Sequence, residues 1–347
     1  MKRIKRTKIF NTNELKAAAR LLKNNQVVAF PTETVYGLGA NAYSKEAIQK
    51  IFRAKKRPAD NPLIIHLAQK KAVNQIISGK LDKQAKKLIA EFWPGPLTLI
   101  LPKNDRIPDI ATGGLDTVAV RIPDHALARQ LISLTGLPIA APSANLSGRP
   151  SPTMAQHVID DLAGRIEGIV EGEQTLIGLE STVLDLSQEE PVLLRPGAIT
   201  YEQLIDTIGE IKVDDNIGLK VNQSSQKALA PGMKYQHYSP LAEVILVEGT
   251  KNKIPTMINQ LIKDSETDNL GVMCVEENKD LYKDVEVRVM GSKKDLISIG
   301  NNIFRLLREF DEAGVDLIYI EGLTRKGIGL AIMNRLRKAA GNQIVEV

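Results

Sequence analysis

The chain has 347 residues, of which 43% are hydrophobic and 25% charged, so it is long enough for two globular domains of roughly 100–200 residues each. Its single cysteine, Cys274, excludes an internal disulfide framework and a cysteine-rich metal site, and the aromatic share of 4% disfavours a base-stacking surface. The net charge of +5 favours an anionic ligand, either a nucleotide or RNA, and does not choose between them.

The N-terminus carries five positive charges in its first eight residues but lacks the apolar core of a signal peptide. No apolar run reaches the ~18 residues that a transmembrane helix needs. We therefore expect a cytoplasmic protein with no membrane segment. The basic end could make a weak RNA contact, but a solvated tail or an edge strand is the simpler interpretation.

Up to residue 195, the hydrophobic pattern switches repeatedly between helical and strand periods. Helices are expected over residues 12–23, with Thr12 or Asn13 as the cap, and over 44–55, 81–92, 125–135 and 155–161. Strands are expected over residues 26–30, 60–67, 97–101, 112–123, 139–141, 169–171, 181–186 and 191–195. Helices and many short strands in mixed order predict an α/β fold with a twisted mixed sheet.

The pattern weakens over residues 206–228, and residues 230–240 are rich in Tyr, His and Lys, which is unusual for a passive connector. Beyond residue 242, strands are expected over 244–246, 270–275, 285–290 and 317–320, and helices over 254–262, 296–310 and 328–340. This alternation predicts a small Rossmann-like α/β domain, although no Gly-x-Gly-x-x-Gly supports dinucleotide binding. We therefore divide the chain into an N-terminal domain (1–210), a linker (211–241) and a C-terminal domain (242–347).

Two polar stretches follow predicted strands, where ligands commonly bind in α/β sheets. Residues 31–39 offer Thr32 and Thr34 before two glycines, which let the backbone approach a ligand. This is not a Walker loop, because the terminal Gly-Lys-Ser/Thr is missing. Residues 138–152 offer Ser143, Asn145 and Ser151. Taken alone, this second stretch could equally be a polar surface loop.

Positively charged side chains gather at the ends of the predicted elements. Lys55 and Arg57 close a helix, where they would also complement the helix dipole. Arg121 and Arg195 lie on strands, where a guanidinium is costly unless it meets an anion. Together with the hydroxyl groups of Thr117, Ser181 and the polar loops, these cations predict a polyphosphate site.

Other chemistries fit the sequence less well. Ser143 lies in Pro-Ser-Ala-Asn and not in the Gly-x-Ser-x-Gly turn of a serine hydrolase. No pair among the four histidines has metal-ligand helix spacing, so a zinc enzyme is not expected. His66 shares a strand face with Ile64, and a lone strand histidine is usually structural.

Eight motifs, in order along nearly the whole chain, resemble the L-threonylcarbamoyl-AMP synthase family in its two-domain form, a YrdC-type catalytic domain plus a C-terminal extension. They are Pro-Thr-Glu-Thr-Val-Tyr-Gly-Leu from residue 31, Lys-x-Arg-Pro from 55 with Asn-Pro-Leu from 61, Trp-Pro-Gly-Pro from 93, Val-Ala-Val-Arg-Ile-Pro from 118, Ala-Pro-Ser-Ala-Asn-Leu-Ser-Gly from 141, Ser-Thr at 181, Leu-Arg-Pro-Gly from 194, and Ala-Pro-Gly-Met-Lys-Tyr-x-His-Tyr-Ser-Pro from 230. The resemblance implies a YrdC-like sheet around a basic cavity.

The activity implied by the resemblance joins ATP, L-threonine and bicarbonate into L-threonylcarbamoyl-AMP and releases pyrophosphate. The product would serve threonylcarbamoyladenosine formation on tRNA, carried out by a separate tRNA threonylcarbamoyl transferase. Mg²⁺ would arrive with ATP and not at a dedicated protein metal site.

Residue roles also follow from the resemblance. L-Threonine would be surrounded by Thr34, His66, Arg121, Ala141 and Ser181, with Arg121 pairing with its carboxylate. ATP would be bound by Arg57, Asn61, Thr117, Ser143, Asn145, Ser151, Arg195 and Tyr235. Lys55 and Arg57 are the expected catalytic residues, because they would neutralise phosphate charge. Tyr235, with His237 nearby, would make the linker a lid that excludes water.

Two alternatives stay open at this point. A double-stranded-RNA-binding module would use the same basic cavity for phosphate. Another carbamoyl transfer enzyme would share the cavity but would not require threonine. The role of the C-terminal domain and the oligomeric state are not predicted.

Overall fold

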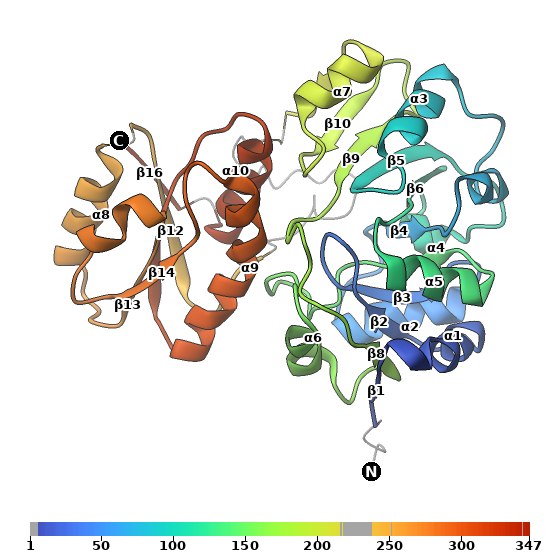
Figure 1. Cartoon of the computed structure of the whole chain (residues 1–347), viewed down its shortest axis with the longest axis horizontal. Helices are drawn as coiled ribbons and strands as arrows, with labels where there is room; N and C mark the ends of the chain where they lie inside the picture. Colours follow the sequence, from blue (N-terminus) through green and yellow to red (C-terminus); the bar gives the residue numbers. More distant parts are fainter. Residues whose placement is uncertain (1–5, 216, 218–237, 251, 342) are drawn as a thin grey trace.

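The computed structural model describes residues 6–215, 217, 238–250, 252–341 and 343–347. Figure 1 shows two α/β bodies side by side, a larger one from the N-terminal part of the chain and a smaller one from the C-terminal part. Helices α9 (Leu296–Ala313) and α10 (Ile328–Ala339) lie on the side of the smaller body that faces the larger one. The predicted fold class, a mixed α/β sheet followed by a small Rossmann-like unit, is confirmed.

The larger body is built on one mixed sheet. Its described strands are β1 (Lys8–Phe10), β2 (Val28–Phe30), β3 (Gly37–Asn41), β4 (Ile64–His66), β5 (Leu97–Pro102), β6 (Thr117–Arg121), β7 (Ile139–Ala140), β8 (Gly168–Val170), β9 (Thr182–Asp185), β10 (Val192–Arg195) and β11 (Lys212–Val213). Their order is β1-β8-β2-β3-β7-β4-β6-β5-β9-β10-β11. The helices are α1 (Leu15–Lys23), α2 (Lys45–Lys55), α3 (Lys83–Phe92), α4 (Asp109–Thr112), α5 (Ala126–Thr135), α6 (Ala155–Leu162) and α7 (Tyr201–Ile208).

The centre of this sheet positions the candidate site. Strands β4 and β6 run parallel, and their register places His66 beside Arg121. On the other side of β4, the antiparallel strand β7 leads into the polar segment that begins at Ala141, whose N–H bonds the Ile64 carbonyl at 2.9 Å. Because side chains two residues apart share a face of a strand, Ile64 and His66 face the same cavity.

The smaller body contains the described strands β12 (Glu243–Glu248), β13 (Leu270–Cys274), β14 (Glu286–Val289), β15 (Leu317–Glu321) and β16 (Ile344–Glu346), which pair in parallel in the order β14-β13-β15-β12-β16. Helix α8 (Ile254–Lys263) packs on one face, where Ile258 belongs to the same hydrophobic cluster as Val247 and Val272. Helices α9 and α10 cover the opposite face. This is a doubly wound arrangement. Cys274 is buried in β13, as its apolar surroundings in the sequence indicated.

Some local predictions were wrong in instructive ways. The cap of the first helical segment is Asn11 and not Thr12 or Asn13, because its side chain accepts from the N–H of Asn13 while Glu14 reaches back to it. The strand expected over 112–123 covers only Thr117–Arg121, because Asp109–Thr112 form helix α4. The first polar stretch leads into strand β3, which pairs with β2. Gly39 is required there because a Cβ would lie 2.6 Å from a ring carbon of Phe30.

Helix α7 was not predicted from the sequence, and only its last residues overlap the stretch 206–228 in which the periodicity weakens. A capping box formed by Thr200 and Gln203 starts it, and burial of Leu204 against the main core stabilises it. The basic N-terminal stretch ends in β1 at the edge of the sheet, which agrees with the edge-strand interpretation.

The predicted lid falls largely outside the described residues, since Tyr235 and His237 belong to the undescribed stretch 218–237. That prediction therefore stays a prediction. No described helix combines the length and apolar character that a bilayer crossing requires.

Candidate active site

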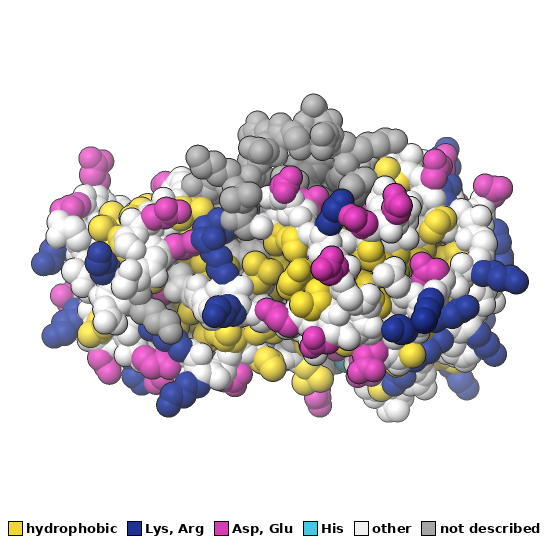
Figure 2. All heavy atoms as spheres, turned by 90° about the horizontal axis from the view of Figure 1, so that it is seen from above, with side chains coloured by type: hydrophobic (Ala, Val, Ile, Leu, Met, Phe, Trp, Pro, Cys, Tyr) yellow, Lys and Arg dark blue, Asp and Glu magenta, His cyan; other side chains and the backbone are white. Residues whose placement is uncertain are grey.

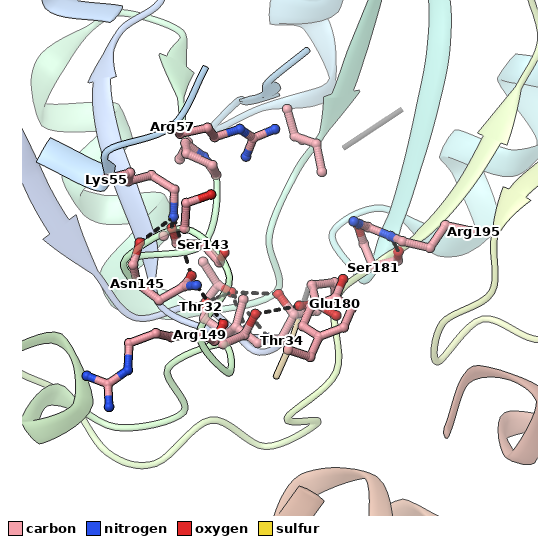
Figure 3. A pocket seen from close by; sticks show the side chains of 18 of the residues that line it. Thr32, Thr34, Lys55, Arg57, Ser143, Asn145, Arg149, Glu180, Ser181 and Arg195 are labelled. Carbon is pink, nitrogen blue, oxygen red and sulfur yellow. Dashed lines mark hydrogen bonds between the residues drawn. The ribbon is translucent and has the colours of Figure 1, made fainter. Parts of the chain in front are cut away.

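One pocket of the larger body brings together most of the predicted site residues (Figure 3). It encloses about 730 Å³, including solvent at its mouth. Among the described residues that line it, the only carboxylate is that of Glu180, whereas the cations are Lys55, Arg57, Arg121, Arg149 and Arg195. Figure 3 shows Arg57 and Arg195 reaching toward the cavity from opposite sides. This excess of positive charge suits a polyanionic ligand.

Arg121 organises a polar recess in this pocket. Its Nε donates to Nε2 of His66 at 3.0 Å, and its Nη1 donates to Oε1 of Glu33 at 3.2 Å. Its Nη2 donates to the hydroxyl oxygens of Thr32 at 3.2 Å and Thr34 at 2.9 Å. The guanidinium is almost fully buried, and every one of these partners is buried too. The recess is therefore a preformed cup in which a cation and two hydroxyl groups are fixed.

His66 is a neutral hydrogen-bonding group in this cup. Because its Nε2 accepts from Arg121, its proton lies on Nδ1, which is 3.2 Å from the Ile64 carbonyl oxygen. Burial, and then the charge of Arg121, lowers the pKa of His66 well below its ordinary value. Because the side chain of His66 lines the pocket, it is available to a ligand and does not serve the core alone.

Lys55 ends helix α2 and is buried against the loop that follows β7. Its Nζ donates to the carbonyl oxygens of Ser143 at 2.5 Å and Asn145 at 2.6 Å. The side-chain Nδ2 of Asn145 donates to the carbonyl oxygens of Leu146 at 2.8 Å and Arg149 at 2.9 Å. Burial, and then the charge of Arg57, lowers the pKa of Lys55 well below its ordinary value. The lysine is thus fixed at the pocket wall, and Asn145 shapes the loop from within.

Ser181 and Arg195 meet because β9 and β10 are antiparallel neighbours. The hydroxyl of Ser181 is 2.7 Å from that of Thr98 and accepts from Nη2 of Arg195 at 3.1 Å. The Nε of Arg195 donates to the Ser181 carbonyl oxygen at 3.0 Å. Burial lowers the pKa of Arg195 to about 10. These groups add a second fixed cation and a hydroxyl to the same cavity.

Sequence reasoning missed the groups that close the pocket on the side of the smaller body. Glu180 accepts from the Ser151 hydroxyl at 2.6 Å through Oε1 and from Nε of Arg335 at 2.8 Å through Oε2. Tyr238 also lines the pocket and packs on Phe304 of α9, with 5.0 Å between ring centroids. The position of Glu180 directly before the Ser-Thr motif was a usable signal. Nothing local marks Arg335, which lies 155 residues further along the chain.

The structure gathers eleven of the predicted site residues in the pocket lining: Thr34, Lys55, Arg57, His66, Arg121, Ala141, Ser143, Asn145, Ser151, Ser181 and Arg195. Two others, Asn61 and Thr117, are not among its lining residues. Asn61 is fully buried, and its side-chain nitrogen and oxygen have no hydrogen-bond partner in the described part of the chain. Thr117 begins β6, at the opposite end of that strand from Arg121. Tyr235 lies outside the described residues.

His157 of helix α6 makes the stability of the fold depend on pH. It is buried, and its Nδ1 accepts from the Thr153 N–H at 3.2 Å. Burial, and then the charge of Arg308, lowers the pKa of His157 to about 3. The unfolded chain, with an ordinary histidine pKa near ~6.5, therefore binds a proton over a pH range in which the folded chain does not.

We predict that the free energy of unfolding falls as the pH drops from about 6.5 toward 3, with His157 contributing about 2–3 kcal/mol of the loss between pH 7 and pH 4. The variant His157→Asn keeps an acceptor for the Thr153 N–H but does not titrate. Urea unfolding of both proteins at pH 7, 5.5 and 4 should give a smaller pH dependence for the variant. Equal slopes would contradict the prediction.

Within the described residues, no group of three or more His, Cys, Asp or Glu side chains is arranged to hold a metal ion.

Two family models match the chain. One, described as telomere recombination (Sua5_yciO_yrdC), matches residues 20–197. The other, described as the threonylcarbamoyl-AMP synthase C-terminal domain (Sua5_C), matches residues 199–341.

Named proteins are similar to the chain over almost all of its length. It is 48% identical over 334 residues to threonylcarbamoyl-AMP synthase of Pyrococcus abyssi, covering 96% of both chains. It is 48% identical over 338 residues to threonylcarbamoyl-AMP synthase of Bacillus subtilis, covering 96% of this chain and 95% of that one. The crystal structure of Pyrococcus abyssi Sua5 complexed with L-threonine matches with a TM-score of 0.92 at 48% identity, over 98% of this chain and 100% of that one. These matches span both bodies, and the chain belongs to the threonylcarbamoyl-AMP synthase family.

Proposed function

We propose that this chain synthesises L-threonylcarbamoyl-AMP from ATP, L-threonine and bicarbonate, with release of pyrophosphate, for threonylcarbamoyladenosine modification of tRNA. The observation that carries the proposal is that the Arg121 cup and the cations Lys55 and Arg57 share one pocket. A small zwitterion and a polyphosphate could be held there side by side. The family to which the chain belongs supports the same activity.

The Arg121 cup is suited to L-threonine. The four hydrogen bonds that Arg121 makes leave one of its five N–H groups for the carboxylate of a bound amino acid. The hydroxyls of Thr34 and Ser181, together with His66, would read the remaining polar atoms, and Ala141 would leave room for the side chain. A related Sua5 was crystallised with L-threonine, which supports this assignment.

The remaining cations would hold ATP. Arg57, Arg195 and the hydroxyls of Ser143 and Ser151 line the cavity and would bind the nucleotide. Asn61 is included because of the family resemblance, since its fully buried amide does not line the cavity. Thr117 and Tyr235 complete the proposed set, and Asn145 would act by shaping the loop that presents Ser143.

The proposed chemistry has two steps. The threonine amine adds to bicarbonate and water leaves, which gives a carbamate. A carbamate oxygen then attacks the α-phosphorus of ATP, the bond to the bridging oxygen breaks, and pyrophosphate leaves with the electron pair. Fixed cations such as Lys55 and Arg57 would stabilise the charge that develops on the phosphate oxygens.

Mg²⁺ would enter with the triphosphate, whose charge it would help to neutralise. A Mg²⁺ ion held by the protein would need carboxylate ligands. Among the described lining residues the carboxylate is that of Glu180, and it already binds Ser151 and Arg335. We further propose that the protein acts in the cytoplasm and that a separate tRNA threonylcarbamoyl transferase consumes the product.

A double-stranded-RNA-binding role is the alternative from another class. On the face seen in Figure 2, the Lys and Arg side chains of the described residues are interspersed with Asp and Glu, and they form no continuous basic surface. The described part of that face therefore offers no track for a duplex phosphate backbone. The basic N-terminal residues 1–5 lie outside the described part of the chain.

The test is to incubate the purified chain with ATP, Mg²⁺, L-threonine and bicarbonate and to measure pyrophosphate and the AMP adduct by mass spectrometry. We expect adduct formation to require every substrate. Adduct formation without threonine would favour another carbamoyl transfer enzyme. Duplex RNA binding with no turnover would favour the binding module.

We predict that Ser143→Ala raises the KM for ATP by about 5-fold to 10-fold and leaves kcat within about 3-fold, the effect of losing one hydrogen bond worth about 1–1.5 kcal/mol. The chemistry should survive because Lys55 bonds the backbone carbonyl of Ser143, which the substitution keeps. Steady-state kinetics would measure both constants, with Ser133→Ala on the exposed face of α5 as a control. Loss of all activity would instead point to a covalent role for Ser143.

A further inference from the structure

A fully buried side chain of the smaller body, that of Arg335 in helix α10, binds the wall of the pocket from behind. Its Nε donates to Glu180 Oε2 at 2.8 Å, and its Nη2 donates to the Glu180 carbonyl oxygen at 3.3 Å. Its Nη1 donates to the Pro196 carbonyl oxygen at 3.0 Å. Arg335 thus binds the residue before Ser181 and the residue after Arg195 at the same time.

Glu180 passes this contact on to the cavity. One oxygen of its carboxylate binds Arg335, and the other accepts from the Ser151 hydroxyl at 2.6 Å. Glu180 and Ser151 are both buried, and both line the pocket. Figure 3 shows Glu180 among the groups that face the cavity, near Ser181 and opposite Lys55.

A buried carboxylate is out of place in a cavity for a polyphosphate, because its charge repels the ligand. Burial alone would raise the pKa of Glu180, but the Arg335 and Arg195 guanidiniums hold it below its ordinary value. The carboxylate therefore stays ionised and needs a dedicated counter-charge. Arg335 provides that charge from behind the pocket wall, since it is not one of the lining residues.

The smaller body contacts the wall at a second point. Arg308 of α9 donates to Asp161 Oδ2 at 2.8 Å and to the Pro150 carbonyl oxygen at 2.6 Å, directly before Ser151. Arg149, on the other side of Pro150, donates to Asp161 Oδ1 at 2.8 Å. Helices α9 and α10 therefore fix the 149–151 and 180–181 segments together.

We propose that Arg335 is a positioning residue for the nucleotide: through Glu180 it holds Ser151 in place and cancels a carboxylate charge in the cavity, so that the smaller body completes the ATP side of the pocket. This inference rests on the proposed function, in which that cavity binds ATP. It gives the C-terminal part of the chain a role in catalysis without placing any of its charged groups on the substrate.

The test compares Arg335→Met with wild type. The variant leaves Glu180 charged and without its partner, so we expect the Kd for Mg·ATP, measured by calorimetry, to rise by about 10-fold or more. We expect the KM for threonine to change by less than about 3-fold, because the hydroxyl of Ser181, the threonine-side residue next to Glu180, keeps its own bonds to Thr98 and Arg195. The matched control is Arg337→Met. Arg337 lies on the same helix as Arg335 but away from the pocket, where it pairs with Glu248 of β12.

A charge-rescue variant separates positioning from simple destabilisation. In Arg335→Met/Glu180→Gln the repulsive charge is gone, and Gln can still accept from Ser151, so ATP affinity should recover by at least about 5-fold over Arg335→Met. If Arg335→Met does not fold, Arg335→Lys tests the positioning part alone, since it keeps the counter-charge but loses the fork that binds Glu180 and Pro196. We then expect the Kd for Mg·ATP to rise by about 3-fold or more, and an unchanged Kd would overturn the positioning role.

The outcomes distinguish the two proposals. Arg335→Met that binds Mg·ATP as tightly as wild type, or that loses affinity no more than Arg337→Met does, would overturn the positioning role alone. A double variant with no recovery would also overturn it. A wild-type chain that binds no Mg·ATP would overturn the proposed function itself.

Discussion

Replacing Lys55 with methionine is expected to lower kcat/KM for ATP by about 10²-fold to 10³-fold, the usual cost of removing one preorganised charge from a phosphoryl-type transition state. The lysine is well placed for this effect, because its ammonium is buried against the Ser143 and Asn145 carbonyl oxygens at the pocket wall. Methionine has a similar length but no charge and no donor. Steady-state kinetics with ATP varied at saturating threonine and bicarbonate would measure the loss.

The substitution should also loosen the loop that Lys55 braces. The buried Asn145 carbonyl oxygen and the part-buried Ser143 carbonyl oxygen lose their donor, and a buried group left unsatisfied costs about 1–3 kcal/mol. Arg53→Met is the matched control, since Arg53 lies in the same last turn of α2 but is exposed. We expect this control to keep wild-type kinetics and stability. A Lys55→Met protein with more than about half of the wild-type kcat/KM would contradict the catalytic assignment.

Many of the pocket residues could be predicted because they lie at the ends of strands and helices that are recognisable from the local sequence pattern. His66 and Arg121 each follow a short apolar run, and parallel pairing of β4 and β6 then places them side by side. Lys55 follows an amphipathic helix with a clear N-cap at Ser44. Whether these side chains meet in one pocket depends on the order of the strands in the sheet. A mixed α/β pattern predicts a single sheet, at whose strand ends such side chains can gather.

Other features could not be predicted, because they depend on contacts between distant segments. Arg335 sits beside Arg337 and Lys338 in the last turns of α10, a pattern that the helix dipole explains equally well. Only the packing of α10 against the larger body shows that Arg335 binds Glu180. The hydrogen bonds that Asn145 makes within its own loop could not be predicted from its motif either, and its contact with ATP stays a prediction.

Replacing Arg121 with methionine is expected to lower kcat/KM for L-threonine by about 10²-fold or more, because a site built for a charged hydrogen-bonding group loses it entirely. The same change should destabilise the fold by about 3–5 kcal/mol, since it leaves a buried carboxylate alone. Glu33 and Arg121 are paired at 3.2 Å with both side chains only 4% exposed. The other Glu33 oxygen has no hydrogen-bond partner among the described residues, so the carboxylate depends on Arg121.

The double variant Arg121→Met/Glu33→Gln separates these two effects. A neutral amide removes the buried unpaired charge, so thermal unfolding should recover a large part of the lost stability. Threonine use should stay low, because the carboxylate of the substrate still lacks its cation. If the double variant recovered both stability and kcat/KM for threonine, Arg121 would be acting only as the structural partner of Glu33. Stability that recovers while threonine use does not is the outcome that assigns Arg121 to the substrate.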